Sequence, residues 1–68
     1  MRYTVLIQYD EVDGIYVASV PELQGCMAHG ETQEDALREV GVVLEMWLEE
    51  ARDMGHQIPK PAYFAHAG

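Results

Sequence analysis

Residues 21–32, PELQGCMAHGET, determine where the predicted strands end and where the helix begins. Pro21 has no backbone N–H for a strand ladder, so it ends the strand that precedes it. Gly25 supplies a tight turn or a bulge, and residues 26–29, CMAH, are predicted to form a short strand. Thr32 is a strong N-cap residue, because its hydroxyl can accept from the amide three positions on. The stretch therefore predicts the end of one strand, a second short strand and the start of a helix.

The sequence after Thr32 has the periodicity of one long amphipathic helix. Its apolar positions recur every three or four residues, as one face of a helix requires; they are Leu37, Val40, Val43, Leu44, Trp47, Leu48 and Ala51. Gly55 suits the left-handed position that follows a helix C-terminus. We therefore predict a helix over residues 33–54.

Two strands are predicted upstream of Pro21. Residues 3–9, YTVLIQY, place β-branched and aromatic side chains at every second position, which favours a strand. Residues 10–14, DEVDG, form a hairpin loop, and residues 15–20, IYVASV, form the second strand. The pair must be antiparallel, since a loop this short cannot cross over. Residues 62–65, AYFA, are a candidate for a short fourth strand.

The predicted order β-β-β-α gives a two-layer α+β fold, with one helix on one face of an antiparallel meander. Its 68 residues form a single domain, 1–68. The second strand is apolar on both faces: Ile15 and Val17 lie on one, and Tyr16, Ala18 and Val20 on the other. One helix covers one face only, and an uncovered apolar face of this kind marks an interface. We therefore expect a homo-oligomer, a dimer or tetramer, or a stable complex with another protein.

Charge narrows the class of partner. Twelve acidic residues against four basic ones give a net charge of −8. Nucleic-acid binding rests on Lys and Arg that displace counterions, so direct binding of DNA or RNA is not expected, and a basic protein is favoured instead. No apolar run approaches the ~18 residues of a membrane span, and residues 1–10 lack the apolar core of a secretory signal. A single cysteine fits a cytoplasmic protein.

Two groups of residues could carry chemistry, and each has a simpler explanation. Cys26 and His29 have opposite parity on a strand and point to opposite faces, so they cannot form a catalytic pair, and we expect Cys26 to pack as a small hydrophobe. Asp10, Glu11 and Asp13 could hold a divalent cation, but their spacing is not that of a calcium loop and a solvated turn explains them. We expect no enzyme, no metal and no cofactor.

The motifs together resemble the HicB family of bacterial antitoxins. The blocks that match are P-x-L-x-G-C at residues 21–26 and G-x-T-x-x-x-A-L at residues 30–37, with Gly14, residues 16–18 and I-P-x-P at residues 58–61. Each block alone is weak, but their order and separation over nearly the whole chain are fairly specific. By these motifs the chain resembles a short HicB antitoxin.

The resemblance implies a partial ribonuclease H-like fold and a non-catalytic role. Proteins of this kind bind and neutralise a HicA-type toxin, a small basic ribonuclease, by occluding its active site. The candidate partner-binding residues are Asp10, Glu11, Asp13 and Tyr16. Many HicB proteins carry a C-terminal DNA-binding segment, and we expect this chain to be the short form without one.

Two alternative functions stay open. The chain could be a stand-alone oligomeric interaction domain whose partner is unknown. A vestigial metal-dependent nuclease is the other alternative, and it would need several clustered carboxylates. Asp10, near the end of the first strand, is the one relic of such a cluster that the sequence offers.

Overall fold

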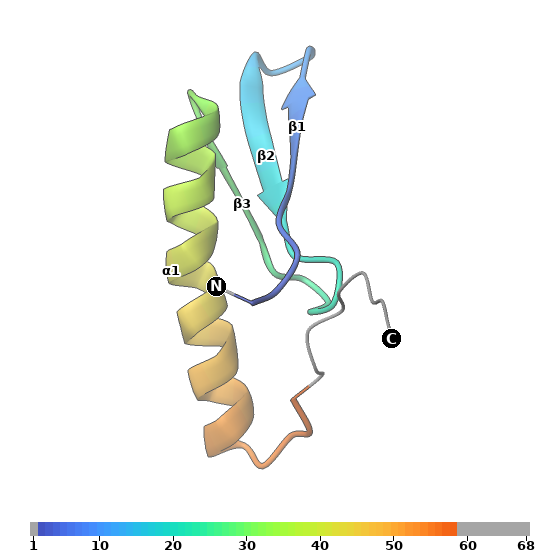
Figure 1. Cartoon of the computed structure of the whole chain (residues 1–68), viewed down its shortest axis with the longest axis vertical. Helices are drawn as coiled ribbons and strands as arrows, with labels where there is room; N and C mark the ends of the chain where they lie inside the picture. Colours follow the sequence, from blue (N-terminus) through green and yellow to red (C-terminus); the bar gives the residue numbers. More distant parts are fainter. Residues whose placement is uncertain (1, 59–68) are drawn as a thin grey trace.

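The computed structural model describes residues 2–58, in which three antiparallel strands precede one long helix (Figure 1). The elements are β1 (Leu6–Asp10), β2 (Ile15–Ser19), β3 (Met27–Gly30) and α1 (Gln33–Asp53). The sheet order is β1-β2-β3, and α1 covers one face of the sheet. The predicted two-layer α+β fold is confirmed, while the predicted strand at residues 62–65 lies outside the described residues.

The first strand is shorter than predicted, because the chain leaves the sheet before Leu6. The backbone N–H of Thr4 donates to both carboxylate oxygens of Glu22, at 3.2 and 3.1 Å, and its hydroxyl donates to Glu22 Oε2 at 2.9 Å. Leu6 pairs with Ser19, so a longer strand would set Thr4 opposite Pro21, which has no N–H to give. At this point Thr4 donates to the side chain of Glu22 in place of the backbone of a neighbouring strand.

The connection from β2 to β3 is a compact turn whose apolar side chains belong to the core. The N–H of Val20 donates to the carbonyl of Cys26 at 2.9 Å, and the N–H of Leu23 donates back to Val20 at 3.0 Å. Gly25 has φ +82°, so the predicted turn at this glycine is confirmed. The turn buries Leu23 and Cys26 almost completely, and it therefore adds to the core rather than merely joining two strands.

The core lies between α1 and the sheet face that carries Ala18 and Ala28. Its buried members are Ala18, Val20, Leu23, Cys26, Ala36, Val40 and Leu44. Val43, Trp47 and Leu48 pack against this cluster as half-buried residues. The predicted helix stripe is correct except at its start, where Ala36 turns inward and Leu37 remains 45% exposed.

Both ends of α1 are capped by local hydrogen bonds. Thr32 Oγ1 accepts from the amide of Asp35 at 3.0 Å, as predicted. At the other end Gly55 has φ +73°, and the N–H of His56 donates to the carbonyl of Ala51 at 2.8 Å. This pattern satisfies carbonyls of the last turn that would otherwise lack donors. The helix therefore ends at Asp53, one residue before the predicted end.

The two layers approach each other closely at Gly30, where β3 meets the first turn of α1. A Cβ atom at this position would lie 2.6 Å from the backbone nitrogen of Ala36 and 2.7 Å from Cβ of Asp35. Neither neighbour is a flexible side-chain end, so neither can move without moving the helix. The absence of a side chain at Gly30 therefore sets how closely α1 packs on the sheet.

Replacing Gly30 by alanine should destabilise the protein, because the added methyl group collides with backbone atoms of α1. Overpacking of this kind costs about 1–3 kcal/mol, measured as the free energy of unfolding in urea. Glu49→Ala is the matched control, since Glu49 is exposed on α1 and its loss should change stability by less than about 0.5 kcal/mol. Wild-type stability of the Gly30→Ala protein would contradict the close packing.

Candidate functional site

The face of the sheet that points away from α1 carries the apolar side chains that the helix leaves uncovered. We call this surface the open face, and its residues are Leu6, Gln8, Asp10, Ile15, Val17, Ser19, Met27 and His29. The register aligns Leu6, Ser19 and Met27 in one row and Gln8, Val17 and His29 in the next. Leu6 is 47% and Met27 56% exposed, and no described residue covers them. The open face is thus accessible and carries four apolar side chains, with the Asp10 carboxylate at its hairpin end.

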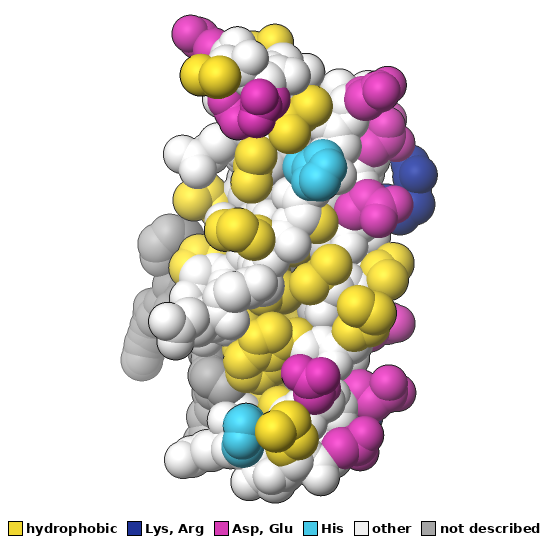
Figure 2. All heavy atoms as spheres, turned by 180° about the vertical axis from the view of Figure 1, so that it is seen from behind, with side chains coloured by type: hydrophobic (Ala, Val, Ile, Leu, Met, Phe, Trp, Pro, Cys, Tyr) yellow, Lys and Arg dark blue, Asp and Glu magenta, His cyan; other side chains and the backbone are white. Residues whose placement is uncertain are grey.

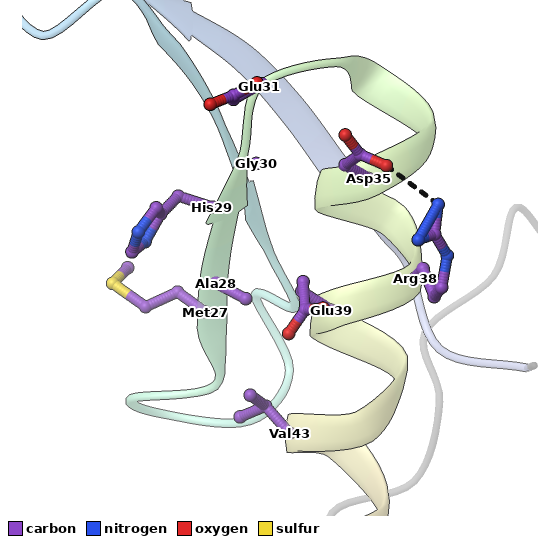
Figure 3. A pocket seen from close by; sticks show the side chains of 9 residues that line it. All are labelled: Met27, Ala28, His29, Gly30, Glu31, Asp35, Arg38, Glu39 and Val43. Carbon is purple, nitrogen blue, oxygen red and sulfur yellow. Dashed lines mark hydrogen bonds and ion pairs between the residues drawn. The ribbon is translucent and has the colours of Figure 1, made fainter.

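A groove lies between the outer edge of β3 and α1. Its volume is about 550 Å³, and its lining residues are Met27, Ala28, His29, Gly30 and Glu31 from the strand side and Asp35, Arg38, Glu39 and Val43 from the helix. In Figure 3 the side chains of Glu39 and Val43 point from α1 towards β3, whereas Met27 and His29 point away from the helix. Figure 2 shows hydrophobic side chains along this seam and acidic ones along the outer side of α1. We call this hollow the β3 groove.

The charges of the β3 groove are mostly acidic. Arg38 Nη2 donates to Asp35 Oδ1 at 2.7 Å, in an ion pair exposed to solvent (Figure 3). That pair contributes little to stability, but it neutralises Asp35. Glu39 makes no ion pair with any residue between 2 and 58. A negative charge without a counter-charge therefore lies on the helix wall of the groove.

The acids predicted to bind a partner gather at the tip of the β1–β2 hairpin. Asp10 Oδ1 accepts from the backbone N–H of Val12 at 3.0 Å and, more weakly, from that of Asp13 at 3.4 Å. The Asp10 carboxylate thus holds the turn in shape, while the side chains of Glu11 and Asp13 are exposed. Within residues 2–58, no three His, Cys, Asp or Glu side chains are grouped so as to hold a metal ion.

Tyr16 lies apart from the hairpin acids, on the helix side of β2. Its ring centroid is 5.0 Å from that of Tyr9, its cross-strand partner, and the two rings are tilted by 59°. Tilted aromatic pairs at this separation are favourable. The structure therefore places the half-buried Tyr16 against the exposed ring of Tyr9 at the hairpin end. Tyr16 follows the acids closely in the chain but lies on a different surface.

Cys26 is buried and carries a free thiol, as expected for a small hydrophobe. Burial removes the thiolate from water, and this raises the pKa of the Cys26 thiol. His29 is exposed on the open face. The two side chains therefore lie on opposite sides of the sheet, which confirms that they do not form a pair.

Sequence reasoning missed the β3 groove. Its strand wall was predictable in part, because a third strand that pairs only with the second has a free edge. Its helix wall depends on the rotation of α1 about its axis, and a stripe of apolar residues fixes that rotation only to within about one residue position. The spacing of Glu39 and Val43, one helical turn apart, is the signal that places both on one wall.

The fold and these surfaces define a small two-layer α+β domain with an open sheet face and an acidic groove at one sheet edge. The chain belongs to the UPF0150-like family, whose profile matches residues 4–59. No helix among the described residues has the length and apolarity to cross a bilayer.

Several curated relatives carry the same family name. A UPF0150 protein of Synechocystis is 41% identical over 59 residues, which cover 87% of this chain and 80% of that protein. One of Thermoplasma acidophilum is 38% identical over 60 residues, covering 88% of this chain and 86% of its own. A second Synechocystis member is 44% identical over 49 residues, or 72% and 70% of the two chains. No solved structure shows significant similarity to the chain.

Stability should depend on alkaline pH through Cys26. The folded state holds the thiol proton to higher pH than the unfolded state. The contribution of the protonated Cys26 thiol to stability is therefore complete below the unfolded pKa of about 8.5. It is lost as the pH rises through the folded pKa. Urea unfolding should show a steeper loss of stability above about pH 8.5 for the wild type than for Cys26→Ala. Equal pH slopes for the two proteins would contradict a buried, protonated thiol.

Proposed function

We propose that this protein is a non-catalytic, HicB-type antitoxin that binds a small basic ribonuclease of the HicA type and covers its active site. The observation that carries the proposal is the β3 groove. Within residues 2–58, a sheet edge without a further strand lies there beside a Glu39 carboxylate that makes no ion pair. The net charge of −8 supports it, since opposite charges steer two proteins together and disfavour nucleic acid as the direct partner. The motif blocks shared with HicB antitoxins supply the identity of the partner.

The proposed mode of action is occlusion rather than chemistry. A ribonuclease must bring a polyanion to its basic surface, and an acidic protein bound there excludes the substrate both by charge and by volume. A ribonuclease H-like ancestry for the fold belongs to the same proposal and does not bring activity with it, because function resides in the site. At the hairpin Asp10 serves the turn, which favours a binding role over the vestigial nuclease.

The open face suits a second copy of the chain. Its carboxylate, Asp10, lies at the hairpin end. The exposed Leu6 and Met27 lie at the other end, where a contact between like-charged copies can bury them. We propose a dimer or tetramer assembled through this face, working in the cytoplasm. The same face favours the second candidate function, a stand-alone oligomeric domain with another protein partner.

Co-expression with the product of the gene next to its own tests the antitoxin role, which requires that product to be a small basic protein. We expect a complex that purifies intact at low salt and weakens as the salt concentration rises, because part of the attraction is between exposed charges. Cleavage of a test RNA by the basic protein should stop at an equal molar amount of this chain. Failure to form a complex, or full cleavage activity within a saturated complex, would rule the antitoxin function out.

The oligomer should depend on Val17, which is central on the open face. Val17→Asp places a charge in the proposed contact and should shift the protein to monomer in sedimentation velocity. Val42→Asp is the control, because Val42 is 52% exposed on α1, outside the open face, and its replacement should leave the oligomer intact. Circular dichroism confirms that both variants are folded. Equal sedimentation of the two folded variants would remove the open face as the interface.

A further inference from the structure

Among residues 2–58, no strand lies beside the outer edge of β3. Val20 and Cys26 are joined by a hydrogen bond of 2.9 Å, and hydrogen-bonded pairs recur at every second position of an antiparallel ladder. Ala28 and Gly30 therefore direct their backbone groups to β2, while Met27 and His29 direct theirs outward. No residue between 2 and 58 bonds to these outward N–H and C=O groups. The edge is thus a free template for another strand.

The β3 groove gives a strand at this edge a second wall. Side chains of a strand alternate between its two faces, so a strand added to β3 would send one side chain towards α1 at the level of Ala28. Its neighbours would point to the open face, beside Met27 and His29. Figure 3 shows Glu39 and Val43 facing the space that the first of these side chains would enter. The groove therefore offers one acidic and one apolar contact to the helix-facing residue.

We propose that the β3 groove binds an extended, basic segment of the partner as a fourth strand, with a Lys or Arg side chain paired to Glu39. The identity of the partner rests on the proposed antitoxin function, but the mode of binding does not. Main-chain hydrogen bonds to Met27 and His29 supply affinity, and the alternate side chain supplies specificity, as in other cases of strand addition.

Beyond Glu39, the surface of α1 continues with a similar combination of apolar and acidic side chains. A second hollow continues along α1 from Val43, and its other lining residues are Met46, Trp47 and Glu50. Trp47 is held in place by a hydrogen bond from its Nε1 to the carbonyl of Gln24 at 3.0 Å. A bound segment can therefore run on over a fixed aromatic side chain towards a second carboxylate, that of Glu50.

A second copy of this chain fits the β3 groove poorly. Antiparallel pairing of two β3 edges about a two-fold axis near Ala28 would bring the two copies of Glu39 towards each other. Like charges placed together across an interface disfavour the pairing, and each copy carries a net charge of −8. The groove and the open face therefore differ in the partner that they accept.

Hydrogen exchange of the full chain with a short peptide tests the proposal. The probe is an acetylated and amidated Lys-Val-Lys-Val-Lys-Val peptide, in which the valine amides face β3 when the lysines face Glu39. At a peptide concentration of about ten times its Kd, the amides of Met27 and His29 should exchange about tenfold more slowly. The same peptide with N-methylated valines keeps its charge but loses these donors, and it should give no protection. Equal protection by both peptides, or none by either, overturns the proposal.

Two charge-matched variants separate the groove from the overall charge. Glu39→Lys should lose the protection at Met27 and His29. Glu45→Lys changes the net charge by the same amount, but Glu45 lines a hollow that includes no residue of β3, so this variant should keep the protection. An equal loss in both variants would show attraction by net charge alone and overturn the proposal.

The remaining outcomes also decide between occupants. Protection of Met27 and His29 in the protein alone that falls on dilution would mean that a second copy occupies the edge, and would overturn the proposal. If the peptide protects these amides but the chain fails to bind the product of the adjacent gene, the result would support strand binding at the β3 groove and rule out the antitoxin function. A complex with the toxin in which these two amides remain unprotected would support the antitoxin function and overturn the proposed binding at the β3 groove.

Discussion

The contact between Gly30 and the first turn of α1 is the constraint on which the other surfaces depend. At this point the two layers touch through backbone atoms, because a Cβ at Gly30 would lie 2.6 Å from the nitrogen of Ala36. The contact holds the helix start directly over the third strand. Helix α1 consequently lies over β3 and β2 and barely reaches β1, so one sheet edge lies beside the helix flank and forms the β3 groove.

The helix position also explains the division of the surface into two kinds of interface. Where α1 lies beside the sheet edge, carboxylates of the helix and unpaired backbone groups of the strand share one hollow. Where no helix lies, the open face carries four apolar side chains, and its carboxylate, Asp10, lies at the hairpin end. Within the described part of the chain, α1 covers one face of the sheet only, and we infer that the apolar side chains of the other face serve assembly.

Features set by neighbours in the chain were predictable from the sequence, and features set by distant contacts were not. The cap at Thr32 and the left-handed Gly55 depend on residues within one helical turn, and both were predicted correctly. The early departure of the chain before Leu6 depends on Glu22, which lies 18 positions from Thr4. The rotation of α1 about its axis exposes Leu37 and turns Glu39 towards β3. It depends on the contact at Gly30, which cannot be read from the periodicity of the sequence.

The sheet order β1-β2-β3, followed by α1, has a consequence for how the protein folds. Each strand pairs with the strand before it in the chain, and the helix packs chiefly on the strand that it follows. Short loops close every one of these contacts, so the entropy lost in each step is small. Proteins dominated by contacts of low sequence separation fold quickly. Leu44 belongs to the core, and Trp47 and Leu48 pack against it, so the β3 groove is complete only after the helix beyond Val43 has packed on the sheet.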